Sequence, residues 1–253
     1  MPVFKYMKYR PEFFNEFLLK LSMIGEFNDP FELTPASMIE SMTEEEFAAY
    51  DEIASQHPSS YETIDDQLDV SCGVRVSIGV ICFTQANDNQ LMWAHYADSH
   101  EGLCLEFDSS STFFNGQHGC SSYQNVGTLM PVKYSQERPT YLMLRELADE
   151  TESWFTKSEA WDYEEEMRLL LPNDNEMFSD VVRCHQKEGD NGERLSFYQT
   201  SPKDIKSVIL GCRMKDNIKK QIFEKCQSIG VHVKEAKPSR TEFKLVISDY
   251  LPN

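Results

Sequence analysis

Residues 74–83, which read V-R-V-S-I-G-V-I-C-F, constrain the fold of this chain more than any other segment. The run begins with alternating apolar and polar residues and ends continuously apolar, which is typical of a strand that enters a hydrophobic core. Residues 167–171, which read M-R-L-L-L and end in three leucines, also indicate a strand. Both runs predict that sheets form the centre of the protein.

The other elements follow from periodicity and from turn residues. Pro11 opens an expected helix whose apolar face includes Phe13 and Leu21 and which ends at Gly25. Asp216 is expected to cap a helix over 218–229 that Gly230 ends. Further helices are expected at 43–54, 91–96 and 140–155. Further strands are expected at 4–10, 103–107, 132–134, 207–210, 231–235 and 243–247, with polar loops at 56–69, 108–127 and 172–194.

Length and composition indicate one folded domain. The chain has 253 residues, of which 40% are hydrophobic and 12% aromatic, enough for a large core. No internal repeat or linker divides it, so we predict a single α+β domain over residues 1–253, with mixed, mostly antiparallel sheets flanked by helices. No apolar run of eighteen residues and no apolar signal core is present, so we expect a cytoplasmic protein without membrane association.

Cysteine usage agrees with a reducing compartment. The seven cysteines are scattered, odd in number and never form C-x-x-C. The His and Cys spacings match no zinc pattern, so no metal is expected.

The formal net charge of −18 limits the partners. Stable binding to DNA or to an anionic membrane needs clustered Lys and Arg, and the sequence has no such run. An acidic surface suits a basic protein partner, whereas an acidic substrate would need a few arginines within a cleft.

Two segments carry more chemistry than packing needs. Residues 161–168 read W-D-Y-E-E-E-M-R, and in an extended chain Glu164 and Glu166 point to one face. Residues 91–102 read L-M-W-A-H-Y-A-D-S-H-E-G. The first segment is equally consistent with a solvated strand entrance that carries a Glu–Arg pair.

These two segments, together with K-Y-M-K-Y-R, F-N-D-P-F-E and S-V-I-L-G, resemble the bacterial family called "domain of unknown function 2971". That resemblance implies an association with phage defence and names no activity.

A second resemblance is to ADP-ribosyltransferases, which carry a cationic residue on the first strand, a hydroxyl or Tyr motif on a later strand, and an E-x-E motif that opens a further strand. Arg10, Thr84 and Glu164-x-Glu166 fall in that order. His95-Tyr96 is an alternative for the middle motif. This resemblance implies a split-sandwich fold and NAD+ as co-substrate.

The same resemblance assigns roles. Glu166 would hold the ribose 2′-hydroxyl beneath an oxocarbenium-like transition state, and Glu164 would orient or deprotonate the nucleophile. Arg10, beside Tyr9, would bind the pyrophosphate. Tyr96 or Trp93 would stack on the nicotinamide, although a pair three residues apart on a helix is also typical of packing. The chain has neither G-x-G-x-x-G nor a P-loop, which argues against dehydrogenases and P-loop NTPases.

The sequence therefore predicts an ADP-ribosyltransferase-like toxin or effector of phage defence. It would modify RNA in preference to protein, through transient contact, and an antitoxin or regulatory protein partner would hold it silent. The alternatives are a non-catalytic sensor or binding module and an NAD+ glycohydrolase.

Overall fold

The structure, a computed structural model, describes residues 1–23, 25–33, 36–37, 43–45, 48, 78–114, 125–141, 154–173, 184–189 and 192–252. Most of the helix expected over 43–54 and all of the loop expected over 56–69 lie outside these residues.

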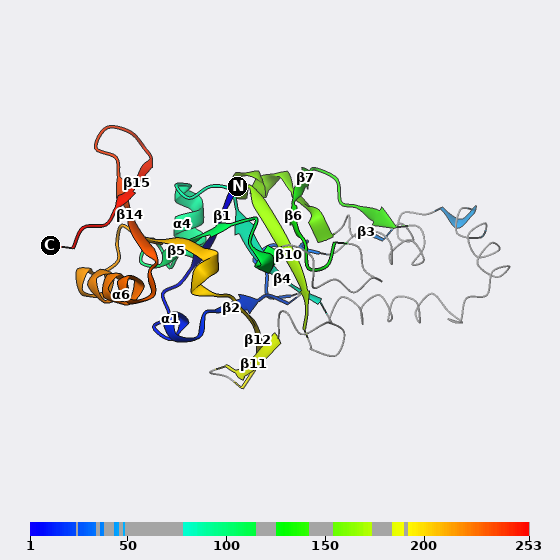
Figure 1. Ribbon diagram of the computed structural model, residues 1–253. Coiled ribbons are helices and arrows are strands. Elements are labelled where there is room, and N and C mark those ends of the chain that lie inside the picture. The colour runs from blue at the N-terminus through cyan, green and yellow to red at the C-terminus, as the bar shows by residue number, and fades with distance from the viewer. Residues whose placement is uncertain are drawn as a thin grey trace.

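An eight-stranded sheet forms the centre of the described part of the chain (Figure 1). Its strands are antiparallel to their neighbours except for the parallel pair β13 and β14. In spatial order they are β15 (Leu245–Asp249), β14 (His232–Pro238), β13 (Ile205–Leu210), β5 (Leu103–Asp108), β1 (Pro2–Met7), β4 (Ile78–Thr84), β10 (Glu166–Pro172) and β6 (Leu129–Pro131).

Smaller elements surround this sheet. A three-stranded sheet contains β11 (Cys184–Glu188), β12 (Arg194–Gln199) and β2 (Leu18–Leu21), and two parallel pairs join β7 (Lys133–Ser135) to β9 (Thr156–Ser158) and β3 (Ala36–Ser37) to β8 (Thr140–Tyr141). Within the described residues, the helices with defined bounds are α1 (Phe13–Glu16), α4 (Gln90–Tyr96) and α6 (Asp216–Ile229), and the 3-10 turns with defined bounds are η2 (Thr112–Phe114), η4 (Glu159–Glu164) and η5 (Pro202–Asp204). The predicted α+β class with mostly antiparallel sheets is confirmed.

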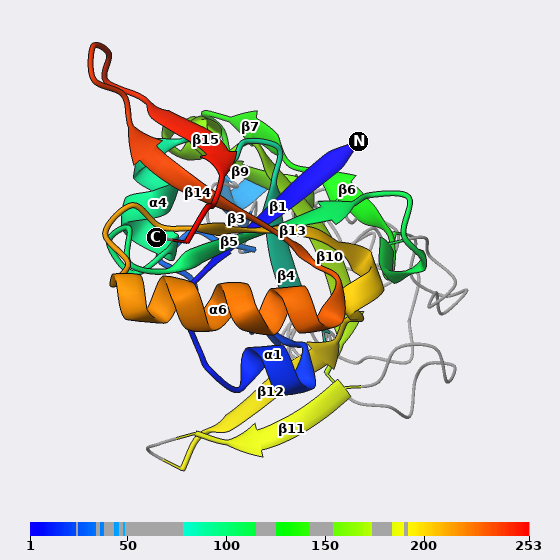
Figure 2. The ribbon, with the colours of Figure 1, turned by 60° about the vertical axis from the view of Figure 1, so that its left-hand side comes forward.

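Two helices cover opposite faces of the large sheet (Figure 2). Alternation along β1 separates the faces, because successive side chains of a strand point to opposite sides. Val3 and Met7 pack in the core that contains the buried residues of α6, whereas Phe4 and Tyr6 pack with the buried residues of α4. A mostly apolar strand with both faces covered is therefore central, as in other buried strands.

The sheet is split between β1 and β4. Strand β4 pairs with β10 at seven successive positions, from Glu166 opposite Thr84 to Pro172 opposite Ile78. On its other edge β4 pairs with β1 only at Phe4 opposite Thr84, and an isolated bridge joins Val80 to Ser22. Beyond the Phe4–Thr84 pair, β1 and β4 are not paired with each other. Side chains from both strands border the resulting gap.

The helix expected to run from Pro11 to Gly25 is wrong. Helix α1 ends at Glu16, because Phe17 adopts a left-handed conformation (φ 54°) and its N–H bonds the Phe13 carbonyl. Residues 18–21 then form β2, which pairs with β12. The apolar residues that suggested one helical face are buried in both arrangements, so periodicity alone did not separate them.

Three further expectations need correction. Thr140 begins a strand rather than a helix, and most of 142–155 lies outside the described residues. Strand β11 lies within the segment expected to be irregular, and β12 begins where that segment ends. Asp216 is the first residue of α6 and Lys215 its N-cap, without a side-chain cap bond, whereas Gly230 ends the helix as predicted (φ 74°).

Candidate functional site: a cavity at the split between β1 and β4

A cavity of about 340 Å³ lies at the split in the sheet. That volume is at the lower end of the range for small-molecule sites. Its walls come from β1, β4, β9, β10, α4, η4 and the segment after β2. The lining residues are Phe4, Lys5, Tyr6, Ser22, Glu26, Phe27, Asn28, Asp29, Glu32, Cys82, Phe83, Thr84, Met92, His95, Tyr96, Lys157, Trp161, Glu164 and Glu166.

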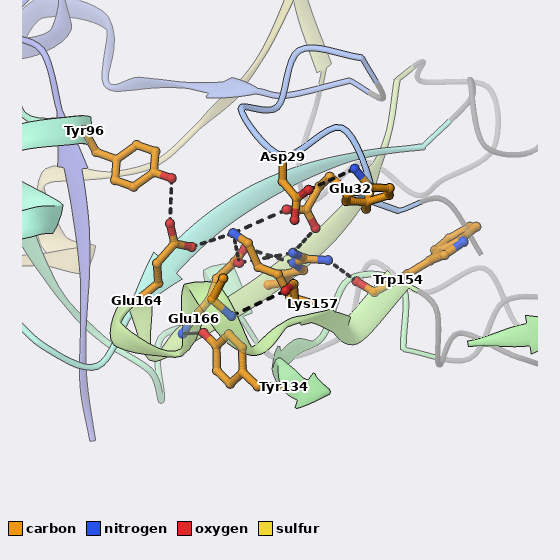
Figure 3. A network of polar contacts seen from close by, with 12 residues as sticks. Asp29, Glu32, Tyr96, Tyr134, Trp154, Lys157, Glu164 and Glu166 are labelled. Carbon is orange, nitrogen blue, oxygen red and sulfur yellow. Dashed lines mark hydrogen bonds and ion pairs between the residues drawn. The ribbon is translucent and has the colours of Figure 1, made fainter. Parts of the chain in front are cut away.

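Five buried charged side chains form a connected cluster beside this cavity (Figure 3). The Nζ of Lys157 lies 2.5 Å from Glu164, 3.0 Å from Glu166 and 3.3 Å from Glu32. Arg168 donates from Nε to Glu166 Oε1 at 2.9 Å and from Nη2 to both Glu166 and Glu32. Its Nη1 donates to the Trp154 carbonyl at 2.6 Å. All donors of the two cations point into a network with little access to water.

A tight turn brings Glu164 and Glu166 together. Glu164 ends η4 and Glu166 begins β10, while Glu165 between them is exposed and left-handed (φ 44°). The N–H of Glu165 bonds the Asp162 carbonyl, and the N–H of Glu166 bonds the Tyr134 hydroxyl. The predicted convergence of the two acids is present, but a turn rather than strand alternation produces it.

The surrounding cations control ionisation within the cluster. Burial by itself would raise the pKa of Glu166, but Arg168 and Lys157 lower that pKa to about 2. Burial would likewise lower the pKa values of Lys157 and Arg168, and the adjacent carboxylates raise both. For Glu32 burial prevails, so its pKa is raised despite the contacts with Arg168 and Lys157.

The cluster carries an excess of negative charge. Three carboxylates (Glu32, Glu164 and Glu166) face two cations, which leaves a formal charge of −1 when all are ionised. A positive charge that develops in the adjacent cavity is therefore stabilised electrostatically, and more strongly than in water because the surroundings are poorly solvated.

The two acids differ in the hydrogen-bonding capacity that remains. Glu166 accepts three bonds from Arg168 and Lys157, out of about four acceptor sites on a carboxylate. Glu164 accepts one bond from the Tyr96 hydroxyl at 2.6 Å and one from Lys157. Of the two, Glu164 has more free capacity to bind a ligand.

Both alternatives for the middle motif line the cavity. Thr84, at the end of β4, is paired in the sheet with both Phe4 and Glu166. On α4, Tyr96 points its hydroxyl at Glu164, and His95 is exposed. Burial, followed by the Glu164 carboxylate, raises the pKa of Tyr96, so this hydroxyl remains a donor at neutral pH.

Three predicted residues lie away from the cavity. Arg10 donates to the Leu18 carbonyl and stacks over the Phe197 ring. Tyr9 packs against the core on the α6 side. Trp93 is fully buried, donates to the Asn87 carbonyl and meets Tyr6 edge to face. The convergence of Arg10 with the two acids is therefore wrong, and Trp93 has the packing role that its helical spacing also allowed.

The sequence assigned no role to most of the lining residues, among them the charged or aromatic Lys5, Glu32, Lys157 and Trp161. Lys5 lies in β1, and burial lowers its pKa against the opposing effect of Cys82 and Glu166. A lysine in the middle of a buried strand is rare enough to have been a signal. Lys157 lies 5.1 Å from the centre of the Trp161 ring. Nothing near Lys157 in sequence indicated that it would be buried.

Two glycines of the quoted motifs have packing roles. A Cβ on Gly102 would lie 2.4 Å from the Met7 carbonyl oxygen, and one on Gly211 would lie 2.1 Å from that of His100. Asp98, Ser99 and His100 are all left-handed, and the N–H of Gly211 bonds the Gly102 carbonyl. The turn after α4 thus requires glycine at both positions and fixes α4 against the sheet.

Among the described residues, no group of three or more His, Cys, Asp or Glu side chains is arranged to hold a metal ion. In the same part of the chain, no helix is long and apolar enough to cross a membrane.

The fold and the site define a mostly antiparallel α+β protein with an acidic cavity at a split in its sheet. Residues 92–169 match the family model described as "Protein of unknown function (DUF2971)", which confirms the family resemblance inferred from the sequence. The match extends from α4 to the first half of β10 and includes seven of the nineteen residues that line the cavity. Neither a comparison with curated proteins nor one with solved structures returned a match.

Proposed function

We propose that the cavity binds NAD+ and that the protein transfers ADP-ribose from it to an intracellular macromolecule, with RNA as the preferred acceptor. The observation that carries the proposal is the adjacency of β1, β4 and β10: the end of β4 at Thr84 pairs with Phe4 in the middle of β1 and with Glu166 at the start of β10, beside one cavity. The ADP-ribosyltransferase resemblance places its motifs near these strands. Thr84 ends β4, Glu164-x-Glu166 leads into β10, and Arg10 follows β1.

The charge of the cavity supports the choice of bond. When the glycosidic bond of NAD+ breaks, C1′ of the ribose loses the bonding electron pair to the nicotinamide nitrogen. Nicotinamide leaves as a neutral molecule, and the ribose becomes an oxocarbenium-like cation. The positive charge thus moves from the nicotinamide ring of the intact substrate to the ribose, so carboxylates beside the ribose stabilise the transition state more than the substrate.

The residues divide this work by their free capacity. Glu164 accepts a hydrogen bond from the ribose 2′-hydroxyl, and the Tyr96 hydroxyl fixes the Glu164 carboxylate. An acceptor hydroxyl then attacks C1′ as nicotinamide leaves, and its proton passes to the Glu164 carboxylate. Glu166, which already accepts three bonds from Arg168 and Lys157, is a positioning residue that holds Lys157 against Glu164. The resemblance assigned the ribose 2′-hydroxyl to Glu166, whereas this assignment gives it to Glu164.

Two other side chains take over the roles assigned to Arg10 and Trp93. Lys5 is the cation of β1 that lines the cavity, and its ammonium group is suited to bind the pyrophosphate. Trp161 lies on the same cavity and offers an aromatic face to the nicotinamide ring.

The proposal places the reaction in the cytoplasm, in a phage-defence effector that a protein partner keeps silent. A non-catalytic sensor is the second candidate, because the full pairing of Glu166, Lys157 and Arg168 is also what a rigid binding pocket requires.

Incubation of the purified protein with adenine-labelled NAD+ and cell lysate tests the proposal. Label should appear on RNA for the wild type and for Glu165→Gln, and be lost in Glu164→Gln. Glu165 is a matched control because it carries the same charge one position away but is exposed to solvent.

The alternatives give different products. Free ADP-ribose without label on any macromolecule indicates a glycohydrolase, and label on protein changes the acceptor. If NAD+ binds in a calorimeter but is never consumed, the protein is a sensor.

A further inference from the structure

We propose that the hairpin between β14 and β15 and the adjacent Arg213 form a docking surface for single-stranded nucleic acid. This hairpin surface is defined by Arg213, Arg240, Phe243 and Lys244. The inference rests on the proposed function for its purpose, which is to present an acceptor strand. The binding itself is measured without NAD+.

A second cavity, of about 430 Å³, lies at this hairpin. Its lining includes Arg213, Arg240 and Lys244 but only one acid, Glu242. Three cations and one acid give a formal charge of +2, in a chain whose net charge is −18. Arg213 is far in sequence from Arg240 and Lys244, so these cations form no basic run in the sequence. In the folded protein they line the same cavity.

The two arginines are free to bind a ligand. Arg213 and Arg240 are exposed, and neither side chain has an ion pair or hydrogen bond within the described part of the chain, whereas Lys244 pairs with Glu242 at 2.6 Å. The side-chain donors of a free guanidinium match the oxygens of a phosphate. In a protein with so many acids, two unpaired arginines at one cavity favour an anionic partner.

Phe243 adds a feature that an anion alone does not require. Its side chain is 102% exposed, and it lies between Glu242 and Lys244 at the hairpin that lines the cavity. Exposed aromatic rings interleaved with cations are typical of proteins that stack unpaired bases while binding the backbone. An acidic peptide would use the arginines but would have no flat ring to place on Phe243.

The hairpin surface is connected to the first cavity through α4. The Gln90 side chain, at the start of α4, donates to the Phe243 carbonyl, and Tyr96, at its end, donates to Glu164. Seven residues of helix span about 10 Å. A strand of a few nucleotides is long enough to cover that distance. Figure 2 shows the hairpin projecting from the sheet on the side away from α6.

Fluorescence anisotropy of a 5′-labelled single-stranded RNA of about twelve nucleotides with the full chain tests this inference. Three phosphate contacts should give a slope of about −2 for log affinity against log salt. Arg213→Glu and Arg240→Glu should each weaken binding at least about ten-fold and make the slope shallower by about 0.7. Phe243→Ala should weaken binding about ten-fold with an unchanged slope.

Lys220→Glu is the matched control, because Lys220 is exposed on α6 and its substitution changes the net charge equally. It should leave the affinity within about two-fold. Equal losses in Lys220→Glu and Arg240→Glu would mean a nonspecific charge effect and overturn the inference. So would absence of binding at about 100 µM protein, or a polyglutamate peptide that binds more tightly than the RNA.

Glu164→Gln separates this inference from the proposed function. If it binds the RNA like the wild type while NAD+ remains intact with both proteins, the docking surface stands and the transferase proposal fails. If NAD+ is consumed but hairpin substitutions do not change RNA affinity, the transferase proposal stands and the docking surface fails.

Discussion

The protein has two charged regions that use similar side chains in opposite ways. Beside the first cavity, Lys157 and Arg168 are buried and bonded to three carboxylates. At the hairpin surface, Arg213 and Arg240 are exposed, and within the described residues their side chains have no ion pair or hydrogen bond. The first region fixes the positions of its own acids, and the second has its cations available for a partner.

This difference shows that charge clustering and function are separate questions. A buried cation that loses its carboxylates destabilises the folded protein, so substitutions in the first cluster should lower the free energy of unfolding. An exposed arginine contributes little to folding, so its presence in an acidic protein is better explained by a partner. Substitutions in the two regions should therefore differ in their effect on the free energy of unfolding, from large at the first cavity to small at the hairpin surface.

Arg168→Met should lower the free energy of unfolding by about 3–5 kcal/mol, because it removes one of the two buried cations that Glu32 and Glu166 share and leaves Lys157 alone to offset three carboxylates. Urea denaturation measures the change. A loss below about 1 kcal/mol would mean that the cluster is hydrated in solution and that the contrast between the two regions is false.

The stability contributed by Glu166 should depend on pH in the acid range. Its pKa is about 2 in the folded protein against an ordinary 4.5, so ionised Glu166 stabilises the folded state by about 3 kcal/mol above pH 4.5. Protonation removes this contribution as the pH falls from about 4.5 to 2. The difference in unfolding free energy between wild type and Glu166→Gln should therefore narrow across that window. A constant difference contradicts the assignment.

Tyr96→Phe should lower the free energy of unfolding by about 2 kcal/mol, because the Tyr96 hydroxyl donates to a buried carboxylate. Thermal unfolding compared with that of Tyr163→Phe provides the measurement, since Tyr163 accepts a bond from Asn89 through its carbonyl and its hydroxyl makes no hydrogen bond within the described residues. Equal effects of the two substitutions would indicate that the Tyr96–Glu164 bond does not persist in solution.

Arg240→Met should change the free energy of unfolding by less than about 0.5 kcal/mol. The same substitution should weaken RNA binding, so it affects the partner and not the fold. Denaturation in parallel with Arg168→Met gives the direct contrast between the regions. A destabilisation comparable to that of Arg168→Met would show that Arg240 is part of the folded core.

Much of the fold was predictable because strands with strong apolar patterns dominate it. The strands at 103–107 and 167–171 and the helices at 91–96 and 218–229 are present, with shifts of a few residues at their ends. The segment after Pro11 was not predictable from periodicity, because a left-handed Phe17 divides it and pairing with β12 decides its second half. Strand β11 is polar and mostly exposed, so it carries little apolar signal.

The site was predictable where one short segment contains it. Glu164 and Glu166 could be paired from their spacing, and Tyr96 lies in the dense segment after Leu91. Lys157, Glu32 and Lys5 come from three other segments, and only the three-dimensional fold brings them together. Arg10 was misplaced because its charge, rather than its position beyond the end of β1, guided the assignment.

Release of nicotinamide from NAD+ by the purified protein tests the central claim most directly. The rate for Glu165→Gln should equal that of the wild type. The rate for Glu164→Gln should be at least about 100-fold lower, since this variant loses the carboxylate proposed to stabilise the ribosyl cation. Equal rates for wild type and Glu164→Gln, with both proteins folded, would contradict the account.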